Sequence, residues 1–64
     1  MSEAISWKKL RRGDVVTVKP VHGRAMEATI DDYFQDRRMV WIRLHDTQER
    51  RIITPRDGIE IVRK

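Results

Sequence analysis

Basic side chains occur in small groups along this chain, and one tryptophan lies among them. The groups are Lys8-Lys9, Arg11-Arg12, Arg37-Arg38 and Arg50-Arg51, and Trp41 is followed two positions later by Arg43. Basic side chains bind phosphate oxygens and release condensed counterions, while an aromatic ring beside an arginine can stack on an unpaired base. The predicted nucleic-acid-binding residues are therefore Lys8, Lys9, Arg11, Arg12, Arg37, Arg38, Trp41, Arg43, Arg50 and Arg51.

Charge is distributed unevenly along the 64 residues, which carry a formal net charge of +4. Residues 1–12 carry +3, residues 13–23 are neutral, residues 24–36 carry −3 and residues 37–64 carry +4. Separate patches of opposite sign would restrict phosphate binding to one surface and leave the acidic segment for a basic partner. In this interpretation Tyr33 joins Trp41 as a second stacking ring.

The same residues also have structural interpretations, and the sequence leaves both open. Trp41 could cover a second, smaller core or pack against Trp7 under the N-terminal segment. The arginine pairs could form a solvated face whose aliphatic stems cover apolar surface.

Catalysis, metal binding and disulfide bonding have little support. The chain has no cysteine and only two histidines, His22 and His45, so a structural zinc site and a thiol nucleophile are not expected. Asp31 and Asp32 are neighbours in a predicted strand, where successive side chains point to opposite faces. A chain of this length also offers little room for a deep pocket. We expect no enzyme, no metal and no cofactor.

The chain has no apolar run long enough to cross a bilayer. The longest, read generously, is Met39-Val40-Trp41-Ile42, whereas a transmembrane helix needs about 20 residues. The sequence predicts no membrane attachment and a cytoplasmic protein.

Short runs of β-branched and aromatic residues alternate with Gly, Pro, Asp and His, a layout typical of several brief strands. We predict strands over residues 15–19, 26–34, 38–44, 49–54 and 59–62, with a tight or 3₁₀ turn at 55–58. Residues 1–12 form a lead-in, either extended or a short helical turn that Ser2 or Ser6 caps and Gly13 ends. One domain spans residues 1–64, with the strands in 13–62.

Alternation within these strands predicts which side chains meet in the core. Tyr33 and Trp41 face outward, and Phe34 is favoured for the inner side. A flat sheet would expose one whole face, whereas a strongly bent sheet that closes on itself buries a single cluster. That cluster comprises Val16, Val18, Ile30, Val40, Ile42, Ile53 and Ile59.

The segment Leu10-Arg11-Arg12-Gly13-Asp14-Val15-Val16-Thr17-Val18 resembles the L-x-x-G-D-x-V-x-V opening of SH3-like small barrels of the KOW and Tudor kind. Residues 28–30, 40–46 and 54–59 resemble later strands and the 3₁₀ turn of such barrels. The resemblance implies an all-β, five-stranded SH3-like barrel. Met26 and Thr47 stand where a methyl-lysine-reading Tudor domain would have aromatic residues, and Gly23 is the single glycine of the first loop.

Two functions remain in competition at this level. The first is a nucleic-acid-binding accessory module that uses the basic residues and Trp41. The second is a protein-interaction module that binds another protein or itself as a homodimer, through a sheet edge or the Met39–Trp41 surface. A small bacterial or phage regulator of a host protein belongs to this second class.

Overall fold

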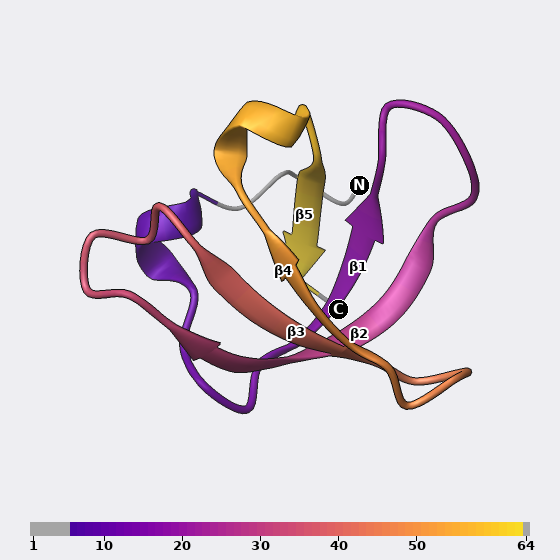
Figure 1. Cartoon of the computed structure of the whole chain (residues 1–64), viewed down its shortest axis with the longest axis horizontal. Coiled ribbons are helices and arrows are strands. Elements are labelled where there is room, and N and C mark those ends of the chain that lie inside the picture. Colours follow the sequence, from indigo (N-terminus) through magenta and orange to yellow (C-terminus); the bar gives the residue numbers. More distant parts are fainter. Residues whose placement is uncertain (1–5, 64) are drawn as a thin grey trace.

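The computed structural model describes residues 6–63, which form a single antiparallel sheet of five strands in the order β4-β3-β2-β1-β5 (Figure 1). The strands are β1 (Val15–Lys19), β2 (Met26–Tyr33), β3 (Val40–Leu44), β4 (Arg50–Ile53) and β5 (Glu60–Arg63). Two 3₁₀ turns complete the chain, η1 (Trp7–Lys9) before β1 and η2 (Pro55–Asp57) between β4 and β5. The prediction of an all-β protein is confirmed.

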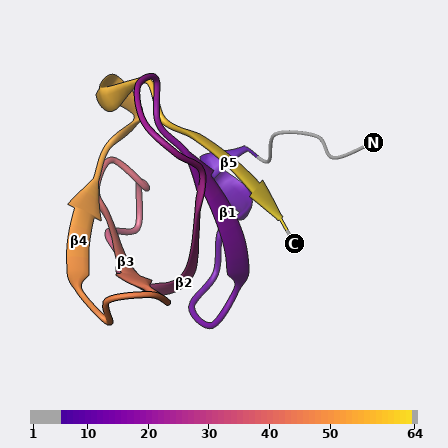
Figure 2. The ribbon, with the colours of Figure 1, turned by 90° about the vertical axis from the view of Figure 1, so that its right-hand side faces the viewer.

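The sheet is strongly bent, so that β4 and the β1–β5 pair stand on opposite sides of the interior (Figure 2). The helical turn η2 connects these two sides at one end. It begins at Thr54, whose side chain and that of Asp57 form a capping box, and ends at Gly58 in the left-handed conformation. This cap fixes the turn by which the chain passes from one end of the sheet to the other.

The core largely follows the predicted alternation. Six of the seven predicted core residues are buried, namely Val16, Val18, Ile30, Val40, Ile42 and Ile53. Ile59 is an exception, because the last strand begins one residue later than predicted and Ile59 packs at the margin of the core. Ile61 is buried instead, with Val18 as its register partner on β1. The other buried apolar residues are Leu10, Ala28, Leu44 and Val62.

Four of the five predicted strands have boundaries that differ from the structure. The observed β2 ends at Tyr33 rather than Phe34, and β3 starts at Val40 rather than Arg38. The strand predicted over 49–54 covers Arg50–Ile53, and that predicted over 59–62 covers Glu60–Arg63. The first three of these strands are shortened and the last is shifted by one residue, at ends where side-chain pattern says least about hydrogen bonding.

A β-bulge in β2 changes the direction of its last side chains. The β2–β3 register shifts between Ile30 and Asp32, so that Asp32 lies opposite Trp41 and Tyr33 lies opposite Val40. Directly opposed residues share a face, and Val40 is fully buried, so Tyr33 points inward and packs against the core. The predicted outward position of Tyr33 is therefore wrong, and Phe34 is 53% exposed rather than inside.

The lead-in is part of the same core. Leu10 is completely buried, and Trp7 packs against the cluster. The segment is tied to β2 by two backbone hydrogen bonds, from Gly13 N–H to the Ile30 carbonyl and from Ile30 N–H to the Asp14 carbonyl, each 2.9 Å. The predicted helical turn is the short η1, which ends at Leu10 rather than Gly13, and Ser6 makes no side-chain cap. Ser2 lies outside the described residues.

Truncating Leu10 tests how strongly the lead-in is anchored. Removing a fully buried leucine side chain leaves a cavity, so Leu10→Ala should lower the free energy of unfolding by about 2–5 kcal/mol. Urea unfolding followed by Trp fluorescence measures this loss. The control is Val21→Ala, because Val21 is 65% exposed. Equal stability of the two variants would contradict a buried anchor at position 10.

Candidate nucleic-acid interface

One surface hollow, about 610 Å³ in volume, is lined by cations from separate parts of the chain. Its cations are Lys8, Lys9 and Arg11 from the lead-in, Arg37 from the β2–β3 turn and Arg63 from the end of β5. Among residues 6–63, Asp14 is the single acidic residue that lines it. We call these six residues the basic hollow. It unites four of the ten predicted binding residues with Arg63, which the sequence reasoning did not select.

Asp14 organises one side of the basic hollow. One of its carboxylate oxygens, Oδ2, accepts a hydrogen bond from the backbone N–H of Arg11 at 3.0 Å and lies 3.4 Å from Nη2 of Arg63. The same guanidinium nitrogen lies 3.4 Å from the carbonyl oxygen of Lys9. Among the described residues, the side chains of Lys8, Lys9 and Arg11 have no carboxylate partner. The hollow therefore retains an excess of positive charge.

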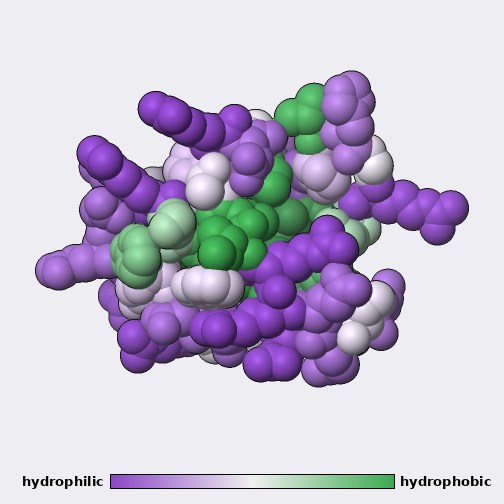
Figure 3. Space-filling model, in the orientation of Figure 1, coloured by the Kyte–Doolittle hydropathy of each residue, from purple (hydrophilic) through white to green (hydrophobic). Residues whose placement is uncertain are grey.

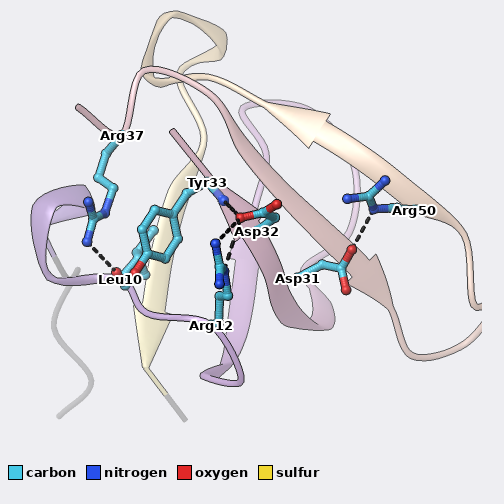
Figure 4. A network of polar contacts seen from close by, with 7 residues as sticks. All are labelled: Leu10, Arg12, Asp31, Asp32, Tyr33, Arg37 and Arg50. Atoms are coloured by element: carbon cyan, nitrogen blue, oxygen red, sulfur yellow. Dashed lines mark hydrogen bonds and ion pairs between the residues drawn. The ribbon is translucent and has the colours of Figure 1, made fainter. Parts of the chain in front are cut away.

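Arg37 is held by contacts within the protein (Figure 4). Its guanidinium carbon lies 3.7 Å from the centre of the Tyr33 ring. Nη1 donates to the carbonyl of Gln35 at 2.7 Å and Nη2 to the carbonyl of Leu10 at 3.3 Å, while Nε is buried without a partner among the described residues. Arg37 thus connects the β2–β3 turn to the lead-in and adds positive charge to the hollow from a fixed position.

Arg12 lies outside the hollow and is neutralised by Asp32. Its guanidinium reaches Oδ1 of Asp32 through Nη2 at 3.0 Å and Nε at 3.1 Å, and its carbon lies 5.8 Å from the Tyr33 ring centre (Figure 4). The pKa of the Asp32 carboxyl is held below its ordinary value of 3.8, chiefly by the hydrogen bond from the backbone N–H of Tyr33 and further by Arg12 and Arg50.

Trp41 faces outward, as predicted, but an arginine covers it. Its register partners are Asp32 on β2 and Ile52 on β4, and its own chain neighbours on β3 are buried. The Arg50 guanidinium carbon lies 4.3 Å from the Trp41 ring, and its Nε pairs with Oδ2 of Asp31 at 2.5 Å. Because of the bulge, Asp31 and Asp32 each bind an arginine on this outer side, rather than pointing to opposite faces of the sheet.

The three remaining predicted cations lie apart from the hollow. Arg51 pairs with Glu49 at 2.8 Å, and Arg38 pairs with Asp36 at 3.5 Å. Arg43 is exposed and lies 3.5 Å from the carbonyl oxygen of Gln48. Arg38 also lines a different hollow with Thr54, Pro55 and Arg56. The predicted binding residues are therefore divided between the basic hollow and the surface outside it, where most of the arginines are paired with acids.

Arg63 could have been identified from topology. The last predicted strand ends at a basic pair, Arg63-Lys64, and a strand antiparallel to β1 ends beside the start of β1. In the structure Arg63 lies opposite Val16, close to the turn at Gly13 and Asp14. The basic residues at the end of the last strand are visible in the sequence. Placing them beside the start of β1 requires knowing that β5 pairs with β1.

Within residues 6–63, no three or more His, Cys, Asp or Glu side chains are grouped to hold a metal ion, and no helix is long and apolar enough to cross a membrane. Comparison with known protein families, curated proteins and solved structures found no match to this chain. The function is therefore inferred from the geometry of the chain's own residues.

The lowered pKa of Asp32 predicts an acid-sensitive contribution to stability. A carboxyl whose pKa is depressed by folding stabilises the fold above its ordinary pKa, and this contribution is lost as the pH falls through the folded-state value. Asp32→Asn should therefore be less stable than the parent protein near neutral pH, and the difference should shrink as the pH falls below the ordinary carboxyl pKa of 3.8. Urea unfolding at several pH values measures both effects. A difference that stays constant with pH would show that ionisation of Asp32 does not matter.

Proposed function

We propose that this protein is a small nucleic-acid-binding accessory module that holds the phosphate backbone of RNA or DNA in the basic hollow. The observation that carries the proposal is the convergence of Lys8, Lys9, Arg11, Arg37 and Arg63 on one concave surface. Cations in an indented surface focus the electrostatic potential and raise the local concentration of a polyanion.

The chemistry of the basic hollow suits phosphate better than base edges. Lysine is a compact charge on a flexible stem, which meets phosphate oxygens without demanding one orientation. Arg37 and Arg63 are already bonded to carbonyl groups or Asp14, so their positions are set before a ligand arrives. Contacts to phosphate carry no sequence information, and we therefore propose binding with modest sequence preference.

This proposal narrows the set of residues selected from the sequence. Trp41 lies beside Asp31 and Asp32, whose negative charge opposes a phosphate backbone, and Arg50 covers one side of its ring. Arg12, Arg38 and Arg51 would have to leave carboxylate partners to bind phosphate. Arg43, on the same face as Trp41, lies outside the hollow. We assign the main phosphate contacts to the five cations of the basic hollow.

We also propose that the chain is an SH3-like small barrel, on the basis of the L-x-x-G-D-x-V-x-V resemblance. Each marked residue of that opening has a structural task. Leu10 fills the core, and Gly13 adopts a φ of +87°, which favours glycine. Asp14 orients Arg11 and Arg63, and Val16 and Val18 are buried.

Fluorescence anisotropy with a labelled single-stranded oligonucleotide tests the proposed function. Binding should weaken steeply with added salt, by a log–log slope of about −0.7 for each phosphate contacted. The double variant Lys8→Glu/Lys9→Glu should bind at least about tenfold more weakly, the equivalent of about 1.4 kcal/mol.

The matched control is Arg38→Glu/Arg51→Glu, which changes the net charge by the same amount outside the basic hollow. Its affinity should stay much closer to that of the parent protein. Equal losses in both double variants would show that only net charge matters, and absence of salt-sensitive binding would refute the proposed function. Circular dichroism verifies that both variants remain folded.

A further inference from the structure

The strand β4 forms an edge of the sheet. It pairs with β3 on one side and has no strand beyond it among the described residues (Figure 2). An edge strand presents unpaired backbone N–H and C=O groups, which are a template for pairing with another strand.

The hydrogen-bond alternation of the β3–β4 hairpin identifies these unpaired groups. Leu44 N–H donates to the carbonyl of Glu49 at 2.8 Å, which makes 44/49 a hydrogen-bonded pair. With the observed register, Arg51 and Ile53 also direct their backbone groups toward β3. The backbone groups of Arg50 and Ile52 therefore point away from β3 to the open edge.

The open edge has a defined end and an apolar side chain. The N–H of Thr54, the next outward-pointing position, already donates to Asp57 Oδ2 at 3.0 Å. Ile52 is 44% exposed and lies next to Trp41 on the outer face. Figure 3 shows apolar surface at the centre of the side on which β3 and β4 lie in Figure 1. Strand addition here would cover both backbone and apolar surface.

We propose that β4 pairs antiparallel with β4 of a second copy of this chain, about a two-fold axis through Ile52. Directly opposed residues of two paired strands must have their side chains on the same face of the sheet. In a two-fold symmetric antiparallel pair, this condition means that one residue of β4 lies opposite the same residue of the second copy. Registers centred on Arg50 or Arg51 would set an arginine against its own copy, which is destabilising. The register centred on Ile52 brings two isoleucines together instead.

This register also uses the available backbone groups. Ile52 of each copy exchanges N–H and C=O with Ile52 of the other, which is the normal pattern of a hydrogen-bonded antiparallel pair. Arg50 lies opposite Thr54 of the second copy. The Thr54 carbonyl already accepts from the Asp57 N–H at 3.1 Å, and its second lone pair can accept from the Arg50 N–H. The Thr54 N–H is retained by Asp57, and the Arg50 guanidinium is retained by Asp31, so neither end of the pairing leaves a charge without a partner. The edge of a second copy therefore matches this one with two isoleucines at the axis and no like charges directly opposite each other, which favours a second copy as the occupant of the edge.

The contact is small, so the dimer is weak. A standard interface buries about 800 Å² on each partner, whereas the whole accessible surface of this protein is 4865 Å² and β4 has four residues. We expect dissociation constants in the range of about 10 µM to 1 mM. A two-fold contact consumes both edges that form it, so association by this route stops at two copies.

Light scattering coupled to size-exclusion chromatography tests the proposal with the full chain. Between about 10 µM and 1 mM, the average mass of the parent protein should rise from one copy toward two. Ile52→Pro removes the outward N–H while leaving the β3–β4 hydrogen bonds in place, so it should remain monomeric over this range. The matched control Ile52→Thr keeps that N–H and a β-branched side chain and should still dimerise.

Two further measurements keep the test decisive if Ile52→Pro fails to fold. Ile52→Asp, which places two carboxylates at the axis, should also be monomeric, because position 52 is exposed and charges of like sign would oppose each other. Amide hydrogen exchange of the parent protein should slow with concentration at Arg50 and Ile52 and stay unchanged at Arg51. A monomer at 1 mM, undiminished association of Ile52→Asp, or a mass above two copies would overturn the proposal.

Discussion

The contact of Arg37 with Tyr33 and with the carbonyl of Leu10 is the interaction on which the candidate site depends. It fixes the β2–β3 turn against the lead-in, whose Leu10 side chain is buried in the core. Arg63 is directed toward the same segment by Asp14 and the Lys9 carbonyl. Without this docking, Lys8, Lys9 and Arg11 would belong to a separate tail. With it, they share one concave surface with cations from elsewhere in the chain.

Pairing with acids distinguishes several arginines outside the basic hollow from most of the cations within it. Four arginines outside the hollow each have a carboxylate partner, so their charge is compensated locally; they are Arg12, Arg38, Arg50 and Arg51. Exposed ion pairs contribute little to stability, typically below about 1 kcal/mol, but they reduce the field that a distant phosphate experiences. The basic hollow brings together four cations that have no carboxylate partner among the described residues, namely Lys8, Lys9, Arg11 and Arg37. The outer face of β3 and β4, with Trp41 and Ile52, is thereby left for a different kind of contact.

Much of the fold could be predicted from the sequence, because alternating β-branched residues report directly on a sheet with one buried face. The inward positions from Val16 to Ile53 follow that pattern. The bulge after Ile30 could not be predicted, because no residue type in the strand marks where an extra residue is inserted. Beyond the bulge, each side chain points to the opposite face from the one that simple alternation predicts. Tyr33 was misplaced for this reason. The ion pairs of Asp31 and Asp32 depend on strand register, and the position of Arg63 depends on which strand adjoins β1.

The proposed function requires the basic hollow, rather than the surface around Trp41, to receive the phosphate backbone. NMR titration of the ¹⁵N-labelled protein with a short single-stranded oligonucleotide tests this most directly, at a protein concentration low enough to keep the chain monomeric. We expect the largest chemical-shift changes at the amides of Lys8, Lys9, Arg11 and Arg63, with small changes along β4. Shifts centred on Trp41, Arg43 and Arg50, with the lead-in unaffected, would contradict it.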